Sequence, residues 1–204
     1  MSFNKIITTV TSRYWDCIHI IGIIYNPNSQ VYNEAYKCFF TSFILLYPID
    51  SKRQNMIEFI KKYPIEEYET SNLRTFQWTY LLQESLGEEI SIENAMKKFV
   101  PSSITKTKWG RCIWYLVHSI SKYLPEYPGK QLLETFKKFV YCLTVIMPCE
   151  ICRVHMKEHI KKFPIDKYMI NRDLVFTWTV ILHNTVNVSL NKPVIKIHDA
   201  WLLY

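Results

Sequence analysis

Glycine and proline are scarce in this chain, which contains 4 glycines and 9 prolines among 204 residues. These residues build most tight turns, so we expect long regular segments and few hairpins. The six cysteines are too few and too dispersed to staple a small disulfide-rich domain. Together with the helical spacing of the apolar residues described below, the shortage of turn residues predicts an all-α fold.

Long apolar runs are also missing. A membrane helix needs roughly 20 consecutive apolar residues, whereas the longest block here, residues 18–25, contains His19 and Gly22. No small-residue cleavage site of a signal peptide follows this block. The sequence therefore predicts neither a membrane partner nor a signal peptide.

Acidic residues are few in the second half of the chain. Residues 1–100 carry 10 basic and 11 acidic side chains, whereas residues 101–204 carry 15 and 7. The positive half could serve a phosphate-bearing cofactor, an acidic protein substrate or nucleic acid. The lysine pairs at 61–62 and 161–162 lie beside aromatic residues, which is typical of solvated ends of amphipathic helices. Nucleic-acid binding is therefore the less favoured interpretation.

The chain repeats itself at an interval of 100 residues. Residues 48–68 align without a gap on residues 148–168, and the match continues from Phe76 to Leu82 onto Phe176 to Leu182. Upstream, Trp15 aligns with Trp114, with a one-residue difference in the length of the loop that follows. The repeat predicts two tandem four-helix-bundle modules, residues 1–100 and 101–204, with a linker around Pro101. Residues of the first copy that are identical in the second, besides Pro48, are Arg53, Met56, Glu58, Ile60, Lys61, Lys62, Pro64, Ile65 and Tyr68.

Apolar spacing predicts four helices in the second copy. A stripe at 113–120 ends at the turn 125–129, and Pro148 suits the first turn of the third helix. Asn171 or Asp173 would cap the fourth helix. Four helices joined by short loops predict a compact bundle. The expected second, third and fourth helices cover residues 132–147, 148–163 and 174–190.

A cysteine pair of C-x-x-C spacing occurs in the second copy alone. Cys149 and Cys152 form a C-x-x-C pair where the first copy has Ile49 and Lys52. This spacing places both sulfurs at one helix start, close enough to bridge, where free N–H groups and the helix dipole favour a thiolate. Zinc sites, thioredoxin-like enzymes and flavin-linked oxidases all use such a pair.

A zinc site is one alternative, because His155 and His159 extend the pair to C-x2-C-x2-H-x3-H. All four residues lie in one predicted helix, whereas zinc modules usually bring ligands from two separate elements. A thioredoxin-like site would need a strand before the C-x-x-C within an α/β pattern. The sequence shows no such pattern.

A polar helix face follows the C-x-x-C. His183, Val186 and Asn187 are spaced i, i+3, i+4, so one face presents two hydrogen-bonding groups around an apolar one. Such a face can hold a flat heteroaromatic ring by its edge, and Lys192 could meet a phosphate. Polar residues near a helix end are more commonly caps and solvent contacts. Trp114 with His118 forms a similar pair whose repeat in the first copy indicates a partly structural role.

Residues 104–204 resemble the Erv/ALR flavin-linked sulfhydryl oxidases through three motifs in order. These are W-G-R-x-x-W-x-x-x-H from Trp109 to His118, P-C-E-x-C at 148–152, and W-x-x-x-x-H-N-x-V-N-x-x-L-x-K-P at 178–193. The first half resembles the family only through the repeat, as a degenerate copy without the C-x-x-C. The resemblance implies a helical bundle that holds FAD and catalyses 2 R-SH + O2 → R-S-S-R + H2O2.

The resemblance also implies roles for individual residues. Cys149 would exchange disulfides with protein thiol substrates, and Cys152 would lie next to the flavin. O2 would be the electron acceptor, and the chain would form either a homodimer or an intrachain pseudo-dimer. Residues matching the FAD-contacting positions are Trp109, Gly110, Arg111, Trp114, His118, His183, Asn184, Val186, Asn187 and Lys192, with Trp201 a weaker match.

The remaining cysteines depart from the cellular pattern, in which a second cysteine pair usually shuttles electrons. No cysteine follows Lys192, and Cys17, Cys38, Cys112 and Cys142 form no C-x-x-C. This minimal pattern resembles the enzymes of large DNA viruses. It predicts a viral protein acting in the cytoplasm of the infected host cell or in the virion, with direct oxidation of substrates at Cys149. A non-enzymatic helical scaffold or a zinc-bound interaction module is the alternative.

Overall fold

The computed structural model describes residues 9–26, 29–87, 91, 93, 96–97, 99 and 105–204, without the side chains of 106–107. Within these residues every regular element is a helix, which confirms the all-α prediction. None of the described helices is long and apolar enough to cross a membrane. The predicted linker around Pro101 lies outside the described residues.

The two halves present the same order of elements. The first half contains α2 (Tyr14–Ile23), α3 (Gln30–Leu45), α4 (Asp50–Lys62), the short 3-10 helix η1 (Ile65–Glu67) and α5 (Asn72–Glu84). The second half contains α7 (Lys106–Lys122), α8 (Lys130–Ile146), α9 (Glu150–Lys162), η3 (Ile165–Tyr168), α10 (Arg172–Ser189) and α11 (Ile197–Leu203).

The four helices predicted in the second half are present as α7 to α10, and the predicted ends of the last three differ from the observed ones by one or two residues. The third helix begins at Glu150 and not at Pro148, because Cys149 has an extended backbone and caps it. Asn171 is the cap of α10, where its side chain accepts the N–H of Leu174 at 2.9 Å. The terminal α11 was not predicted, since seven residues are too few to show a helical period.

Equivalent side chains make equivalent contacts in the two halves. In each half a tryptophan of α5 or α10 donates its indole N–H to a backbone carbonyl at the end of α4 or α9. An arginine of α4 or α9 donates to a backbone carbonyl in the turn that precedes its own helix. The bonds are Trp78 to Tyr63 O (2.9 Å), Trp178 to Phe163 O (2.8 Å), Arg53 to Tyr47 O (2.7 Å) and Arg153 to Met147 O (2.6 Å).

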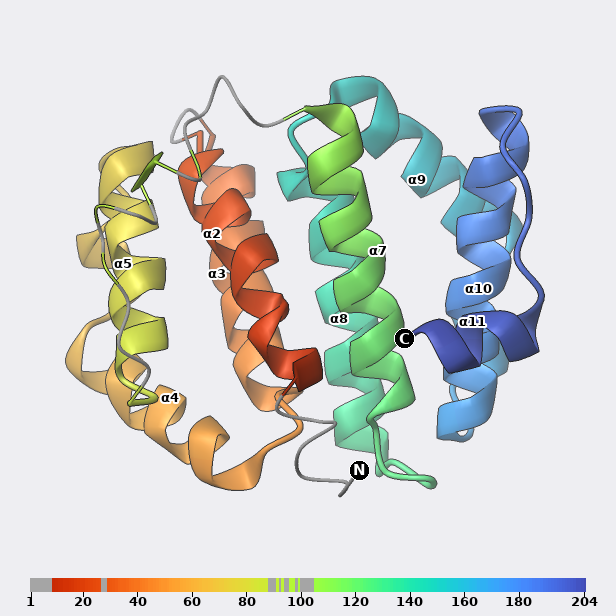
Figure 1. Ribbon diagram of the computed structural model, residues 1–204, viewed down its shortest axis with the longest axis horizontal. Coiled ribbons are helices and arrows are strands. Elements are labelled where there is room, and N and C mark those ends of the chain that lie inside the picture. The colour runs from red at the N-terminus through yellow and green to blue at the C-terminus, as the bar shows by residue number, and fades with distance from the viewer. Residues whose placement is uncertain are drawn as a thin grey trace.

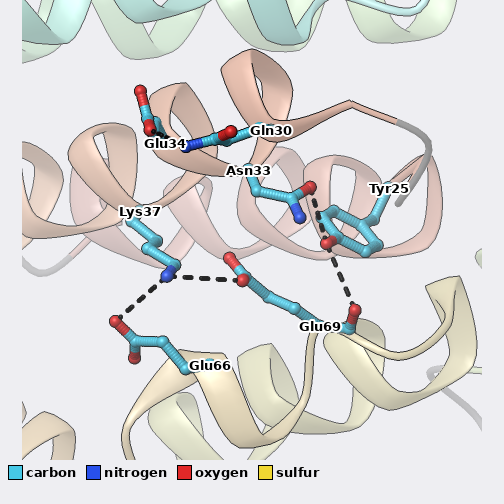
Figure 2. A network of polar contacts seen from close by, with 7 residues as sticks. All are labelled: Tyr25, Gln30, Asn33, Glu34, Lys37, Glu66 and Glu69. Atoms are coloured by element: carbon cyan, nitrogen blue, oxygen red, sulfur yellow. Dashed lines mark hydrogen bonds and ion pairs between the residues drawn. The ribbon is translucent and has the colours of Figure 1, made fainter.

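A network of polar contacts connects helices of the first half (Figure 2). The Tyr25 hydroxyl donates to Asn33 Oδ1 at 2.9 Å and to the carbonyl of Glu69 at 3.3 Å. Lys37 pairs with the carboxylates of Glu66 at 3.3 Å and Glu69 at 3.6 Å. Burial raises the pKa of Glu69, and the Lys37 ammonium partly offsets this. In the second half Lys137 pairs with Asp166 at the same relative positions.

Corresponding helices form the contact between the halves. Helices α2 and α3 lie beside α7 and α8 in the middle of the molecule, while α5 and α10 lie at opposite ends (Figure 1). The rings of Phe39 and Phe139 stack at 5.1 Å across the α3–α8 contact, and both are fully buried. Burying one such side chain contributes about 1.5–3 kcal/mol to stability, so this contact holds the halves together.

Trp178→Phe should lower the free energy of unfolding by about 1–3 kcal/mol. The substitution leaves the Phe163 carbonyl without its indole donor and opens a space beside a fully buried ring. Urea unfolding followed by circular dichroism measures the change. Tyr127→Phe alters an exposed ring and is the control. Equal stability of the two variants would contradict the structural role of the indole hydrogen bond.

Candidate active site

The C-x-x-C pair forms a disulfide at the start of α9. The Cα atoms of Cys149 and Cys152 are 5.2 Å apart, and Cys149 Sγ accepts the backbone N–H of Cys152 at 3.3 Å. Both residues are half-buried and pack against the core, while Pro148 and Glu150 beside them are exposed. A thiolate formed here would be stabilised by this N–H group and by the helix dipole. The position therefore suits reversible thiol–disulfide exchange.

The predicted zinc alternative is not supported by the arrangement of its four residues. Among the described residues no three His, Cys, Asp or Glu side chains are placed to hold a metal ion. The rings of His155 and His159 lie 6.4 Å apart, and the two cysteines bond to each other.

Three rings from two helices stack near the centre of the second half. The His183 ring of α10 lies 4.1 Å from the Trp114 ring of α7, and the two planes differ by 8°. His118 stacks on the same pair, 5.7 Å from Trp114 and 5.1 Å from His183. The motif residues Trp114, His118 and His183 thus form one cluster, as the resemblance implied they should if they share a ligand.

A chain of hydrogen bonds fixes the protons on both imidazoles. The Thr179 hydroxyl donates to the carbonyl of Phe176 at 2.7 Å, so it accepts from His118 Nδ1 at 2.8 Å. His118 Nε2 then has a free lone pair and accepts from His183 Nδ1 at 2.9 Å. This order leaves Nε2 of His183 as a hydrogen-bond acceptor.

Both imidazoles are neutral at pH 7. Burial lowers the pKa of His118 well below its ordinary value, and the neighbouring His183 lowers it further. Burial, assisted by the charge of Lys192, lowers the pKa of His183 to about 4. The hydrogen-bond chain requires a neutral His118, because that ring both donates and accepts, and a neutral His183 keeps the lone pair on its Nε2.

The first half keeps only part of this arrangement. His19 Nδ1 lies 3.0 Å from Thr79 Oγ1, which repeats the His118–Thr179 contact. The other ring nitrogen lies 2.7 Å from Oε1 of Gln83, the residue that aligns with His183. The histidine–threonine contact is therefore present in both halves, with or without the disulfide. The second imidazole, His183, occurs only in the half that contains the disulfide.

The segment after α10 is held against the bundle by Asn184. Its amide nitrogen donates to the carbonyl of Ile195 at 2.8 Å, and its oxygen accepts the Ile195 N–H at 3.0 Å. The Asn187 carbonyl accepts the backbone N–H of Lys192 at 2.8 Å. Val186 is half-buried, and the Lys192 side chain is exposed. Asn184 thus positions the chain terminus, a function that its motif position did not indicate.

Two cations that the sequence did not single out flank Trp201. The Nζ atom of Lys122 and the guanidinium carbon of Arg172 each lie 5.4 Å from the ring centre. Lys122 also donates to the Trp201 carbonyl at 2.6 Å, and burial lowers its pKa. The edge of the ring packs on Phe176 at 4.8 Å. Because Lys122 and Arg172 come from the ends of different helices, no local motif could have paired them.

The W-G-R motif lies at the start of α7. Trp109 is buried and, together with Met147 and Pro148, lines a small cavity beside the C-x-x-C. Arg111 is exposed on the same helix. A Cβ atom added to Gly110 would meet no atom within 4 Å, so the helix surface beside it is open. Gly110 and Trp114 are four residues apart and share this open face.

These observations fit the FAD implied by the resemblance. The open face at Gly110, the half-buried stack of Trp114 and His183, and the acceptor on His183 suit a flat ring with polar edges. Lys122 and Arg172 beside Trp201, and Lys192 near His183, carry positive charge that would suit a diphosphate.

The second half matches known proteins. A family model described as Erv1 / Alr family matches residues 111–202. The FAD-linked sulfhydryl oxidase ERV1 of rice (Oryza sativa subsp. japonica) is 32% identical over 102 residues, which cover 48% of this chain and 51% of the rice protein. The Arabidopsis thaliana protein of the same name is 32% identical over 101 residues, covering 48% and 52%.

A viral relative matches over more of its own length. The FAD-linked sulfhydryl oxidase of African swine fever virus (isolate Tick/Malawi/Lil 20-1/1983) is 30% identical over 90 residues, which cover 43% of this chain and 72% of the viral protein. The chain thus spans about half the length of the plant relatives and most of the viral one. Trp109 and Gly110 lie just before the residues that the family model matches.

The His118–His183 pair should make stability depend on pH. The pKa values of both histidines are lower in the folded chain than in the unfolded chain. The pair therefore contributes fully to the free energy of unfolding above about pH 6.5, where both states are neutral. That contribution falls as the pH drops from about 6.5 toward about 4, the folded-state pKa of His183. Urea unfolding at several pH values gives the free energy of unfolding as a function of pH. Between about pH 6.5 and 4 this free energy should change less steeply with pH in His183→Gln than in the unaltered chain. Parallel curves for the two proteins would refute the neutral-pair assignment.

Proposed function

Because the chain belongs to the Erv1 / Alr family, we propose that it is an FAD-dependent thiol oxidase that forms disulfide bonds in substrate proteins. The observation that carries the proposal is the Cys149–Cys152 disulfide at the start of α9, in the half that also holds the Trp114–His183 stack. The named relatives are FAD-linked sulfhydryl oxidases, which supports the same reaction, 2 R-SH + O2 → R-S-S-R + H2O2.

The protein chemistry begins at Cys149. A substrate thiolate attacks its sulfur and releases Cys152 as a thiolate, and a second substrate thiolate then closes the product disulfide and leaves both cysteines reduced. The N–H of Cys152 and the dipole of α9 stabilise the charge on the released sulfurs. Bound FAD supplies the acceptor for the two electrons of the reduced pair and their delivery to O2.

The cofactor would be held by residues of α7, α10 and the segment after α10. His183 Nε2 would accept a hydrogen bond from the ring edge, and Trp114 would support the ring face. Lys122 and Arg172, which flank Trp201, would balance the negative charge of the phosphates in addition to the residues that the resemblance implies. The implied positions are Trp109, Gly110, Arg111, Trp114, His118, His183, Asn184, Val186, Asn187, Lys192 and Trp201.

We also propose that residues 1–100 are a degenerate helical module and 101–204 the active domain, which together form an intrachain pseudo-dimer. The recurring tryptophan and arginine hydrogen bonds support a common origin of the two halves. The viral relative supports action in the infected cell or the virion. The competing function is a non-enzymatic helical scaffold.

Purified protein should show a flavin absorption band that bleaches with dithiothreitol and returns in air. Cys149→Ser and Cys152→Ser should each lower oxygen consumption with dithiothreitol at least about 100-fold, because neither leaves an exchangeable disulfide. Cys38→Ser, which lies outside the site, is the matched control. A colourless protein with stoichiometric zinc would overturn the oxidase proposal.

Residues 101–204 expressed alone should dimerise or aggregate. Removing the first half uncovers Phe139 on α8 and Tyr115 on α7, which contact it through Phe39 and Tyr14. An apolar face of this kind is rarely left in water. Light scattering after gel filtration measures the oligomeric state of the fragment. A fragment that is soluble, monomeric and fully active would contradict the pseudo-dimer.

A further inference from the structure

Four cysteines lie outside the candidate active site, two in each half. Cys17 is on α2 and Cys38 on α3, while Cys112 is on α7 and Cys142 on α8. None of them is disulfide-bonded, and Cys17 and Cys142 are buried. Since α2 packs on α7 and α3 on α8, all four are on helices that form the contact between the halves.

Cys17 and Cys112 face each other across the α2–α7 contact. The two helices run antiparallel (Figure 1), and the Tyr14 ring meets the Tyr115 ring at 6.4 Å. Cys17 follows Tyr14 by three residues and Cys112 precedes Tyr115 by three, so both lie one helical turn along from that ring contact on the facing sides. The two thiols interact electrostatically and line the same small cavity.

Cys38 and Cys142 face each other in the same way across the α3–α8 contact. These helices are also antiparallel (Figure 1) and meet at two points: the Tyr32 hydroxyl donates to the Ile146 carbonyl at 3.3 Å, and Phe39 stacks on Phe139. Cys38 lies between the two contacts on α3, and Cys142 lies between them on α8. These two thiols also interact electrostatically.

The internal repeat does not account for these pairs. The positions that align with Cys17 and Cys112 hold Leu116 and Arg13, and those that align with Cys38 and Cys142 hold Lys138 and Ser42. Each facing pair therefore combines one cysteine from each half at non-equivalent positions. A free buried cysteine is usually a small apolar core residue, but that role alone does not require two facing pairs across one interface.

We propose that Cys17–Cys112 and Cys38–Cys142 are two latent disulfide sites whose oxidation joins the two halves covalently. With a small-molecule disulfide as oxidant, each pair reacts as 2 R-SH + R′-S-S-R′ → R-S-S-R + 2 R′-SH, and the electrons and protons leave on the released thiols. Burial raises the pKa of Cys17 and of Cys142, so thiolate is scarce and the exchange is slow in the folded chain.

The experiment uses the full chain with Cys149→Ala and Cys152→Ala, so that its own disulfide takes no part. One sample, the oxidised sample, is incubated with oxidised glutathione near the melting temperature of the protein. A matched sample, the reduced sample, is incubated with dithiothreitol at the same temperature. Maleimide labelling after denaturation should add four labels to the reduced sample and none to the oxidised one. Peptide mapping should find Cys17 linked to Cys112 and Cys38 to Cys142. Because each bond closes a loop of roughly 100 residues, the melting temperature should rise by at least about 5 °C.

Single variants separate the two sites and test them independently of the oxidase proposal. Cys17→Ser should lose only the first cross-link, and Cys38→Ser only the second. In the chain that retains Cys149 and Cys152, both variants should leave the flavin band and dithiothreitol turnover unchanged. Glutathione adducts without cross-links, scrambled pairing, or four thiols that persist through melting in the oxidant would each overturn the proposal.

Discussion

The packing of aromatic side chains between α3 and α8 is the contact on which the rest of the structure depends. Phe39 and Phe139 are fully buried against each other, and each also belongs to the core of its own half. The arrangement fixes α8, and α8 in turn carries the turn at Met147 from which α9 and its disulfide begin. The half without the cysteine pair therefore supports the half that has it.

The two halves share a set of polar contacts and differ at a few positions around the disulfide. Both halves hold a histidine against a threonine of the last bundle helix, and both begin the preceding helix after an arginine-braced turn. The second half has an imidazole at position 183 where the first has the amide of Gln83, and cysteines at 149 and 152 where the first has Ile49 and Lys52. Cys149 and Cys152 pack against the same core as Ile49 of the first half.

Local signals predicted most of the fold, and non-local contacts account for what was missed. Apolar spacing and the Asn171 cap were sufficient for α7, α8 and α10, since helical period and capping are properties of neighbouring residues. The start of α9 was misplaced because a capping thiol has no strong sequence signature. Lys122, Arg172 and the facing cysteines could not be paired from the sequence, because tertiary packing alone brings them together.

Fusion of the two halves changes the thermodynamics of their association. Two separate bundles would part on dilution, whereas halves on one chain meet at an effective concentration that the connecting segment sets. The contact through Phe39 and Phe139 therefore persists however scarce the protein is. It also pairs one half that carries the disulfide with one half that lacks it, so the surfaces of the two halves can differ without a symmetry constraint.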